Sequence, residues 1–242
     1  MSHLYLVRHG QAGTRDAYDS LSELGRRQAR LLGEYFRREG VHFTTALTGK
    51  MLRQQETAAE VKAAYHQAEA AFPEVTVEPG WSEFDLNEVY RGLAPQLCAE
   101  DPEFQCEYQA MREQTRANRG VHEAEVHRRW LSCDTKVVAA WVSGRYEYGG
   151  ESWQAFHTRI ADSLASMNRG PKHANAVVFT SAMPIAICLG LVLGTDSDRV
   201  LQLAGALQNA SFTMLRVRNQ QFRLHGFNSV PHLTAKELRT HR

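Results

Sequence analysis

The sequence lacks a surplus of either charge: 28 lysines and arginines stand against 27 aspartates and glutamates, for a formal net charge of +1. Such a balance gives no electrostatic attraction to a nucleic-acid backbone or to an anionic membrane. The chain also has no apolar run near the roughly 18 residues that a transmembrane helix requires. We therefore expect neither a nucleic acid nor a membrane as a partner.

Cysteine is scarce, with four residues in a chain of 242, and their spacing fits neither a disulfide-rich scaffold nor a paired zinc site. The four are Cys98, Cys106, Cys133 and Cys188. A secretory signal is not evident, because the first residues lack its basic region and its long apolar region. We expect reduced thiols and a cytoplasmic location.

The stretch 122–127 has a histidine at each end and two glutamates between them, which raises the question of a metal site. Residues five apart lie about 140° apart around a helix, whereas the metalloprotease motif spaces its histidines by four so that they share one face. This spacing argues against zinc, and we expect neither a metal nor another cofactor.

Apolar residues make up 43% of the chain, enough for a sizeable core in one large domain or two small ones. Short apolar runs predict strands, and apolar residues at helical spacing predict helices. The predicted strands are 4–7, 44–48, 75–77, 176–181, 211–217 and 222–227, the last two forming a hairpin. Residues 92–148 have a mostly helical pattern, and we interpret them as an insertion that packs over a ligand site.

The first candidate site follows the first predicted strand, where the sequence continues Arg8-His9-Gly10. Open α/β sheets bind ligands at the carboxyl ends of their strands. A neutral imidazole is a good nucleophile near pH 7, a guanidinium is suited to a phosphoryl group, and glycine permits close approach of a ligand. Alone, such a tripeptide is more often an ordinary strand end, so other residues must support it.

Two further strand ends carry polar residues. Arg53 lies in the first turns of the helix that follows the strand 44–48, where a helix N-terminus attracts anions. The alternative is a solvated surface arginine. The strand 176–181 ends at Ser181, just before Pro184 opens another helix whose first N–H groups point above the sheet.

A loop after the third strand contains Glu83, Asp85 and Glu88 among apolar residues. An apolar setting raises the pKa of a carboxyl group toward the range of a general acid. Ordinary acidic residues on the surface would give the same pattern, so both interpretations stay open from the residues alone.

Together these segments resemble the histidine phosphatase superfamily, also described as phosphoglycerate mutase-like. The similar segments are 6–10, 21–29, 47–58, Glu83, 150–152, 209–211, 227–228 and 232–233. The resemblance implies a single α/β domain over residues 1–242. Its fold would be a three-layer sandwich with a mostly parallel central sheet flanked by helices, plus the helical insertion 92–148.

The resemblance also implies a two-step phosphoryl transfer without metal. His9 would be the nucleophile and form a phosphohistidine, and Glu83 would be the acid and base, with Asp85 and Glu88 as alternatives. The phosphate would be bound by the side chains of four residues: Arg8, Arg53, Ser181 and Gln11. The expected ligands are a phosphorylated small-molecule substrate and, in the same pocket, phosphate or sulfate.

One position departs from the family, because Ser181 stands where a second pocket histidine is usual. Losing one such donor costs ~10²–10³ in rate. Two functions therefore remain: a phosphatase of small phosphorylated compounds, or a weakly active or non-catalytic member that binds phosphorylated ligands. A mutase is less favoured, because the insertion has mixed charge. The sequence names no substrate, places specificity in residues 92–148, and leaves a monomer and a homodimer open.

Overall fold

The computed structural model describes residues 2–13, 19–117, 124–169, 174–218 and 220–241. These residues form two compact units, one of Met1–Glu83 with Arg159–Arg242 and the other of Phe84–Thr158. We describe each unit by itself. Of the predicted stretch 122–127, His122 and Glu123 lie outside the described residues.

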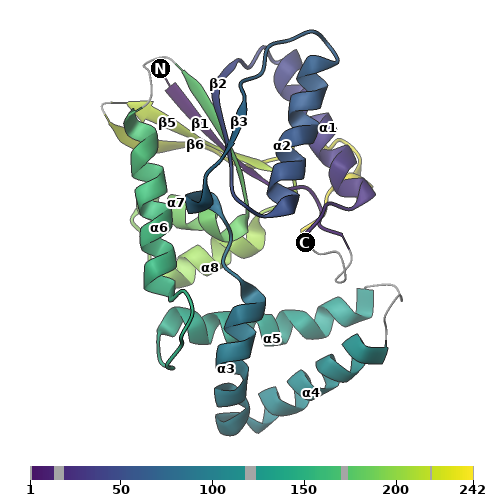
Figure 1. Ribbon diagram of the computed structural model, residues 1–242, viewed down its shortest axis with the longest axis vertical. Helices are drawn as coiled ribbons and strands as arrows, with labels where there is room; N and C mark the ends of the chain where they lie inside the picture. Colours follow the sequence, from purple (N-terminus) through teal and green to yellow (C-terminus); the bar gives the residue numbers. More distant parts are fainter. Residues whose placement is uncertain (1, 14–18, 118–123, 170–173, 219, 242) are drawn as a thin grey trace. The chain divides into compact units, whose positions relative to one another are not determined.

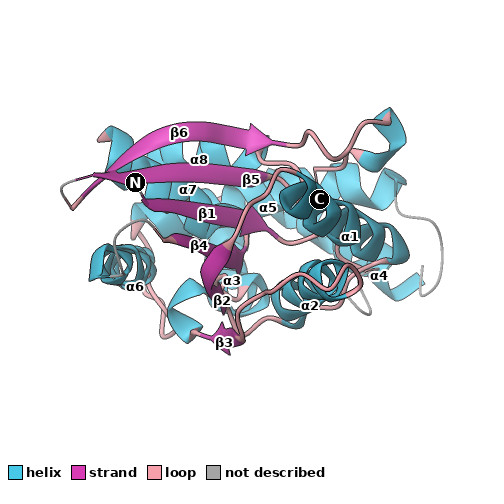
Figure 2. Ribbon diagram, turned by 90° about the horizontal axis from the view of Figure 1, so that it is seen from above, coloured by secondary structure: helices cyan, strands magenta, loops and turns pink. Residues whose placement is uncertain are grey.

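The first unit is built on a mixed sheet, which has six strands in the described part of the chain in the order β3-β2-β4-β1-β5-β6. β1 pairs in parallel with β4, and β2 pairs in parallel with β3 and β4, whereas the β5–β6 hairpin joins β1 in antiparallel pairing. Figure 2 shows one continuous twisted sheet with β6 and β3 at its edges. The strands are β1 Ser2–Arg8, β2 Phe43–Thr48, β3 Val75–Val77, β4 Asn175–Thr180, β5 Phe212–Arg218 and β6 Gln221–Ser229. The predicted strands, the hairpin and the α/β fold class are confirmed.

Helices α1 (Glu23–Arg38) and α2 (Leu52–His66) lie on one side of this sheet, and α7 (Ala182–Leu193) and α8 (Ser197–Ala206) lie on the other (Figure 1). Alternate residues of the strands face α1 and α2, because successive side chains of a strand point to opposite faces. The resulting core contains an aromatic cluster in which rings from three strands surround one helical ring. Its members are Tyr5, Phe36, Phe43 and Phe212, all buried.

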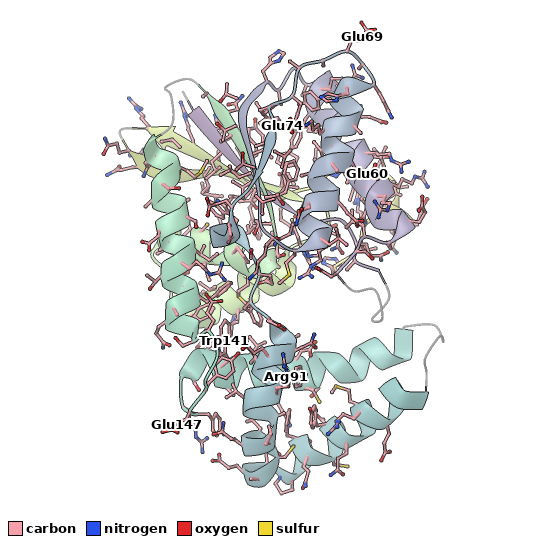
Figure 3. The ribbon with its side chains drawn as sticks, viewed as in Figure 1. Glu60, Glu69, Glu74, Arg91, Trp141 and Glu147 are labelled. Carbon is pink, nitrogen blue, oxygen red and sulfur yellow. The ribbon has the colours of Figure 1, made fainter. Side chains whose placement is uncertain are left out.

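Charged residues join α1 to α2 on their outer surface. Arg26 pairs with Glu56 and Glu60, and Arg30 Nε lies 2.7 Å from Glu60 Oε2 (Figure 3). Exposed ion pairs contribute little stability individually. The buried face between the helices and the sheet, rather than these pairs, holds α2 in place, and α2 begins beside Arg53.

The second unit is helical in the described residues, consisting of α3 (Leu86–Glu100), α4 (Pro102–Ala117), α5 (Ala124–Ser143) and the first part of α6 (Trp153–Ser166). The predicted insertion 92–148 lies within it. Its core includes Trp141 (Figure 3), whose ring stacks on Phe84 at 4.5 Å between centroids and meets Trp153 edge to face. These aromatic residues stabilise the unit as a packed body of its own.

Short 3₁₀ helices complete the described fold at Pro79–Trp81, Met167–Arg169 and Lys236–Leu238. In the described parts of the chain, no helix has the length and apolar character needed to cross a membrane.

Candidate active site

The predicted site residues gather where β1, β2 and β4 end. The strands β1 and β4 are parallel neighbours in which Arg8 lies opposite Thr180. His9 and Ser181, the next residue of each strand, therefore lie side by side. The His9 amide also donates to the Thr180 carbonyl at 2.9 Å. Arg8, His9, Arg53 and Ser181 are all buried, although three of them are strongly polar or charged. Buried polar groups of this kind need partners, and these partners define the site.

The hydrogen bonds of His9 fix its tautomer. Its Nδ1 lies 2.7 Å from the Gly10 carbonyl, which only accepts, so Nδ1 carries the proton. Arg53 Nε, which only donates, lies 3.2 Å from His9 Nε2, so Nε2 bears the lone pair. Burial, and then the charges of Arg53 and Arg8, hold the pKa of His9 well below its ordinary value of 6.5. The imidazole is therefore neutral at pH 7 with Nε2 available as a nucleophile.

Arg53 is held by a carboxylate that the sequence did not single out. Its Nη1 lies 3.0 Å from Asp19 Oδ1, and the Arg53 side chain is 8% exposed whereas that of Asp19 is 58% exposed. Thr57, one turn further along α2, accepts from the Gly10 amide at 3.1 Å and donates to the Arg53 carbonyl. Thr57 lies four positions after Arg53 and therefore shares its helix face, but the sequence did not single it out.

Backbone carbonyls surround the charge of Arg8. Its Nη1 donates to the carbonyls of Leu207 and His241, the latter at 2.9 Å. The loop after α8 also contacts the neighbouring histidine, because the Ala210 amide donates to the His9 carbonyl at 3.1 Å. The segment 209–211 thus positions the end of β1.

The N-terminus of α7 brings two more predicted residues together. Ser181 is the N-cap of this helix, and its Oγ accepts from Gln54 Nε2 at 2.8 Å. Glu83, half-buried, accepts from the amide of Met183 at 3.2 Å. A helix N-terminus carries partial positive charge, so this corner favours anions. Gln54, like Asp19 and Thr57, is a residue of the site that the sequence did not single out.

Comparison with known proteins identifies the family of this chain. The family model described as histidine phosphatase superfamily (branch 1) matches residues 4–142 and 134–230. The chain belongs to the histidine phosphatase superfamily. No curated protein matches it.

Several solved structures share the fold of this chain at low sequence identity. YhfR from Bacillus stearothermophilus is 18% identical with a TM-score of 0.65, and covers 96% of this chain and 100% of its own. The mycobacterial glucosyl-3-phosphoglycerate phosphatase is 21% identical with a TM-score of 0.56, covering 94% of this chain and 98% of its own. A mutant phosphoserine phosphatase from Entamoeba histolytica, in complex with phosphoserine, is 16% identical with a TM-score of 0.57, covering 96% of this chain and 100% of its own.

Gly10 and Gly25 lie where the backbone of the loop after β1 passes very close to the backbone of α1. A β-carbon on Gly10 would overlap the Gly25 carbonyl, and a β-carbon on Gly25 would overlap the Gln11 carbonyl. Next to this crossing, Gln11 Oε1 accepts from Ser22 Oγ at 2.8 Å, which ties Gln11 to the N-terminus of α1. Only glycine permits this approach, which brings the loop after His9 against α1.

Asp85 and Glu88, the alternatives to Glu83, belong to the other unit. The Asp85 carboxylate caps α3 by accepting from the amides of Asn87 at 2.9 Å and Glu88 at 3.1 Å. Both side chains are exposed. Of the three carboxylates, Glu83 is the one that belongs to the same unit as His9 and bonds to the α7 N-terminus.

Proposed function

We propose that this protein is a metal-independent phosphatase that hydrolyses phosphate monoesters of a small molecule through a phosphohistidine on His9. The observation that carries the proposal is the state of that imidazole, which is buried and neutral. Its Nδ1 carries the proton and donates it to the Gly10 carbonyl, and its Nε2 faces Arg53. This arrangement supports nucleophilic attack by Nε2 without a separate base.

In the first step, His9 Nε2 forms a bond to phosphorus while the bond from phosphorus to the ester oxygen breaks. Glu83 donates its proton to that leaving oxygen, so an alcohol departs. In the second step, water attacks the phosphohistidine, Glu83 takes a proton from the water, and inorganic phosphate leaves with His9 restored. A loose phosphoryl transition state needs mainly positioning and charge stabilisation.

Arg8 and Arg53 supply that stabilisation in the proposal. Both guanidinium groups are buried beside His9, where charge interactions are stronger than in water. When a phosphoryl group binds, the N–H of Arg53 that bonds to His9 turns to an equatorial oxygen and releases the Nε2 lone pair. Two guanidinium charges balance a phosphate dianion, which is why the proposed reaction needs no metal.

The substrate class is a small phosphorylated metabolite, and we assign its selection to residues 92–148. Their organisation in a separate helical unit supports this assignment, since a separate unit can vary without disturbing the strand ends. All four cysteines are free thiols, which supports a cytoplasmic enzyme.

The test is hydrolysis of p-nitrophenyl phosphate, with a chelator present, by the wild type, His9→Ala and the double variant Ser181→His/Gln54→Ala. The second substitution makes room for the imidazole, because the Gln54 amide contacts Ser181 Oγ. We expect activity in the wild type, none in His9→Ala, and a phosphohistidine in wild type quenched with base.

If the wild type does not hydrolyse p-nitrophenyl phosphate but the double variant does, the result would instead support the second candidate function, a non-catalytic binder of phosphorylated ligands. The observation in favour of that function is the uncharged Ser181 at the end of β4. No hydrolysis by any of the three proteins would refute the phosphatase proposal.

A further inference from the structure

Gln54 is held by a hydrogen bond at each end of its side-chain amide. It is fully buried near the start of α2, directly after Arg53. Its Oε1 accepts from the amide of Met51 at 3.3 Å, and its Nε2 donates to Ser181 Oγ at 2.8 Å. A backbone N–H can only donate, so it selects the amide oxygen and leaves the NH₂ group for Ser181.

This orientation decides what the Ser181 hydroxyl can do. Because its oxygen accepts from Gln54, the hydroxyl keeps its own proton for another acceptor. Within the described residues, no protein acceptor is found for that proton. Without Gln54, the Ser181 hydroxyl could rotate and direct its proton in several ways. Here Gln54 occupies one lone pair of the oxygen, so fewer directions remain for the O–H bond.

The backbone makes room for Gln54. A β-carbon on Gly49 would overlap Gln54 Oε1 and would lie 2.9 Å from Ser82 Cα. The end of β2 therefore has a glycine where the amide of Gln54 folds back against it. The contact of Gln54 with Ser181 therefore joins two buried side chains, and a larger residue at position 49 would disturb it.

We propose that Gln54 is a positioning residue that makes the Ser181 hydroxyl a dedicated hydrogen-bond donor to the phosphoryl group. The inference rests on the proposed function, in that Ser181 is taken to contact the phosphoryl oxygens. It explains how a neutral serine serves where the superfamily usually has a histidine. The donated bond from Gln54 also polarises the O–H and strengthens it as a donor.

A double-mutant cycle with Gln54→Met and Ser181→Ala tests the inference. We expect Ser181→Ala to lower kcat/KM for p-nitrophenyl phosphate by ~10²-fold, as for other pocket donors. We expect Gln54→Met to lower it by ~10-fold, and the double variant to be no worse than Ser181→Ala, because Gln54 acts through Ser181. Losses should fall on kcat more than on KM.

Two variants separate positioning from structural damage. Gln55→Met is the matched control, since the neighbouring Gln55 is only partly buried and donates to the Lys50 carbonyl rather than to Ser181. We expect it to keep wild-type activity. Gln54→Glu keeps the acceptor for Met51, but its carboxylate takes the Ser181 proton; its loss should exceed that of Gln54→Met and shrink as the pH falls and the carboxylate protonates.

The binding of inorganic phosphate, measured by calorimetry, separates this inference from the proposed function. If no protein shows His9-dependent hydrolysis, the proposed function fails, and the same cycle in the phosphate Kd still decides the role of Gln54. Multiplicative losses in the double variant, or a Gln54→Glu variant no more impaired than Gln54→Met at any pH, would overturn the inference.

Discussion

The folded state should lose stability in acid because of His232, which lies in a segment that carried the superfamily resemblance. Its side chain is 6% exposed, and its ring lies 6.2 Å from that of Tyr35. Burial lowers the pKa of His232 to about 3, although the nearby backbone of Ala210 acts in the opposite direction.

The sign follows from proton binding in the two states. An unfolded chain protonates this imidazole below about pH 6.5, whereas the folded protein does so only near pH 3. Between these values the unfolded state holds more protons, so the free energy of unfolding falls as the pH falls. The stability is fully present above pH 6.5, and the loss from this one group between pH 7 and pH 5 is about 2 kcal/mol, at 1.36 kcal/mol per pH unit.

The assay is urea unfolding at pH 7 and pH 5 for the wild type, His232→Leu and His42→Gln. The difference between the two pH values should be about 2 kcal/mol smaller in His232→Leu, which has no imidazole to protonate there. His42 is exposed, so His42→Gln is the control for loss of a surface imidazole and should match the wild type. Equal differences in all three proteins would refute the reasoning about His232.

Three further predictions concern the proposed mechanism. Since burial and two arginines lower the pKa of His9, the neutral form persists in acid, and kcat/KM should not fall with a midpoint at pH 6.5; a wild-type profile of kcat/KM against pH with a midpoint near 6.5 would contradict this. Glu83→Gln should slow an alkyl phosphate by ~10²-fold but p-nitrophenyl phosphate by less than ~10-fold, because only the poor leaving group needs a proton; equal losses would exclude the acid role. Asp19→Asn should tighten inorganic phosphate by about two- to fivefold in calorimetry, since it frees Arg53 from an exposed partner, and an unchanged or weaker Kd would show that Asp19 supports Arg53 instead.

The location of the site could be predicted because β1 is an interior strand. It pairs with β4 on one side and β5 on the other, and both of its faces are covered, so its sequence is a continuous apolar run. Such a run ends where the polar residues begin. The sequence therefore indicated both the strand and its functional end, at Arg8 and His9.

Gln54 and Asp19 could not be predicted, because their contacts join distant parts of the chain. Gln54 bonds to a residue 127 positions away, and Asp19 to one 34 positions away. In the sequence, Gln54 is indistinguishable from its neighbour Gln55. Tertiary packing alone makes the first fully buried and leaves the second partly exposed. Periodicity reports which face of a helix is apolar, and a polar residue on the buried face gives no such signal.

The full extent of the helical unit could not be predicted from the spacing of apolar residues either. Residues 92–148 have helical spacing, but the compact unit extends over Phe84–Thr158. The added residues include Phe84 and Phe156, whose rings pack with Trp141. Their place in that core depends on a contact between the two ends of the segment, which no local spacing encodes.

The N-terminus of α7 links the acid to phosphate binding in the proposed mechanism. This helix is apolar and buried from Met183 to Gly190, so its first N–H groups act in a medium where water screens little. Glu83 takes one of them, from Met183. A protonated carboxyl is a weaker acceptor than a carboxylate. Protonation of Glu83, which the first step requires, therefore loosens its hold on this N–H and leaves the helix terminus to the phosphoryl oxygens, so that the acid form and the phosphate-binding form of the site are favoured together.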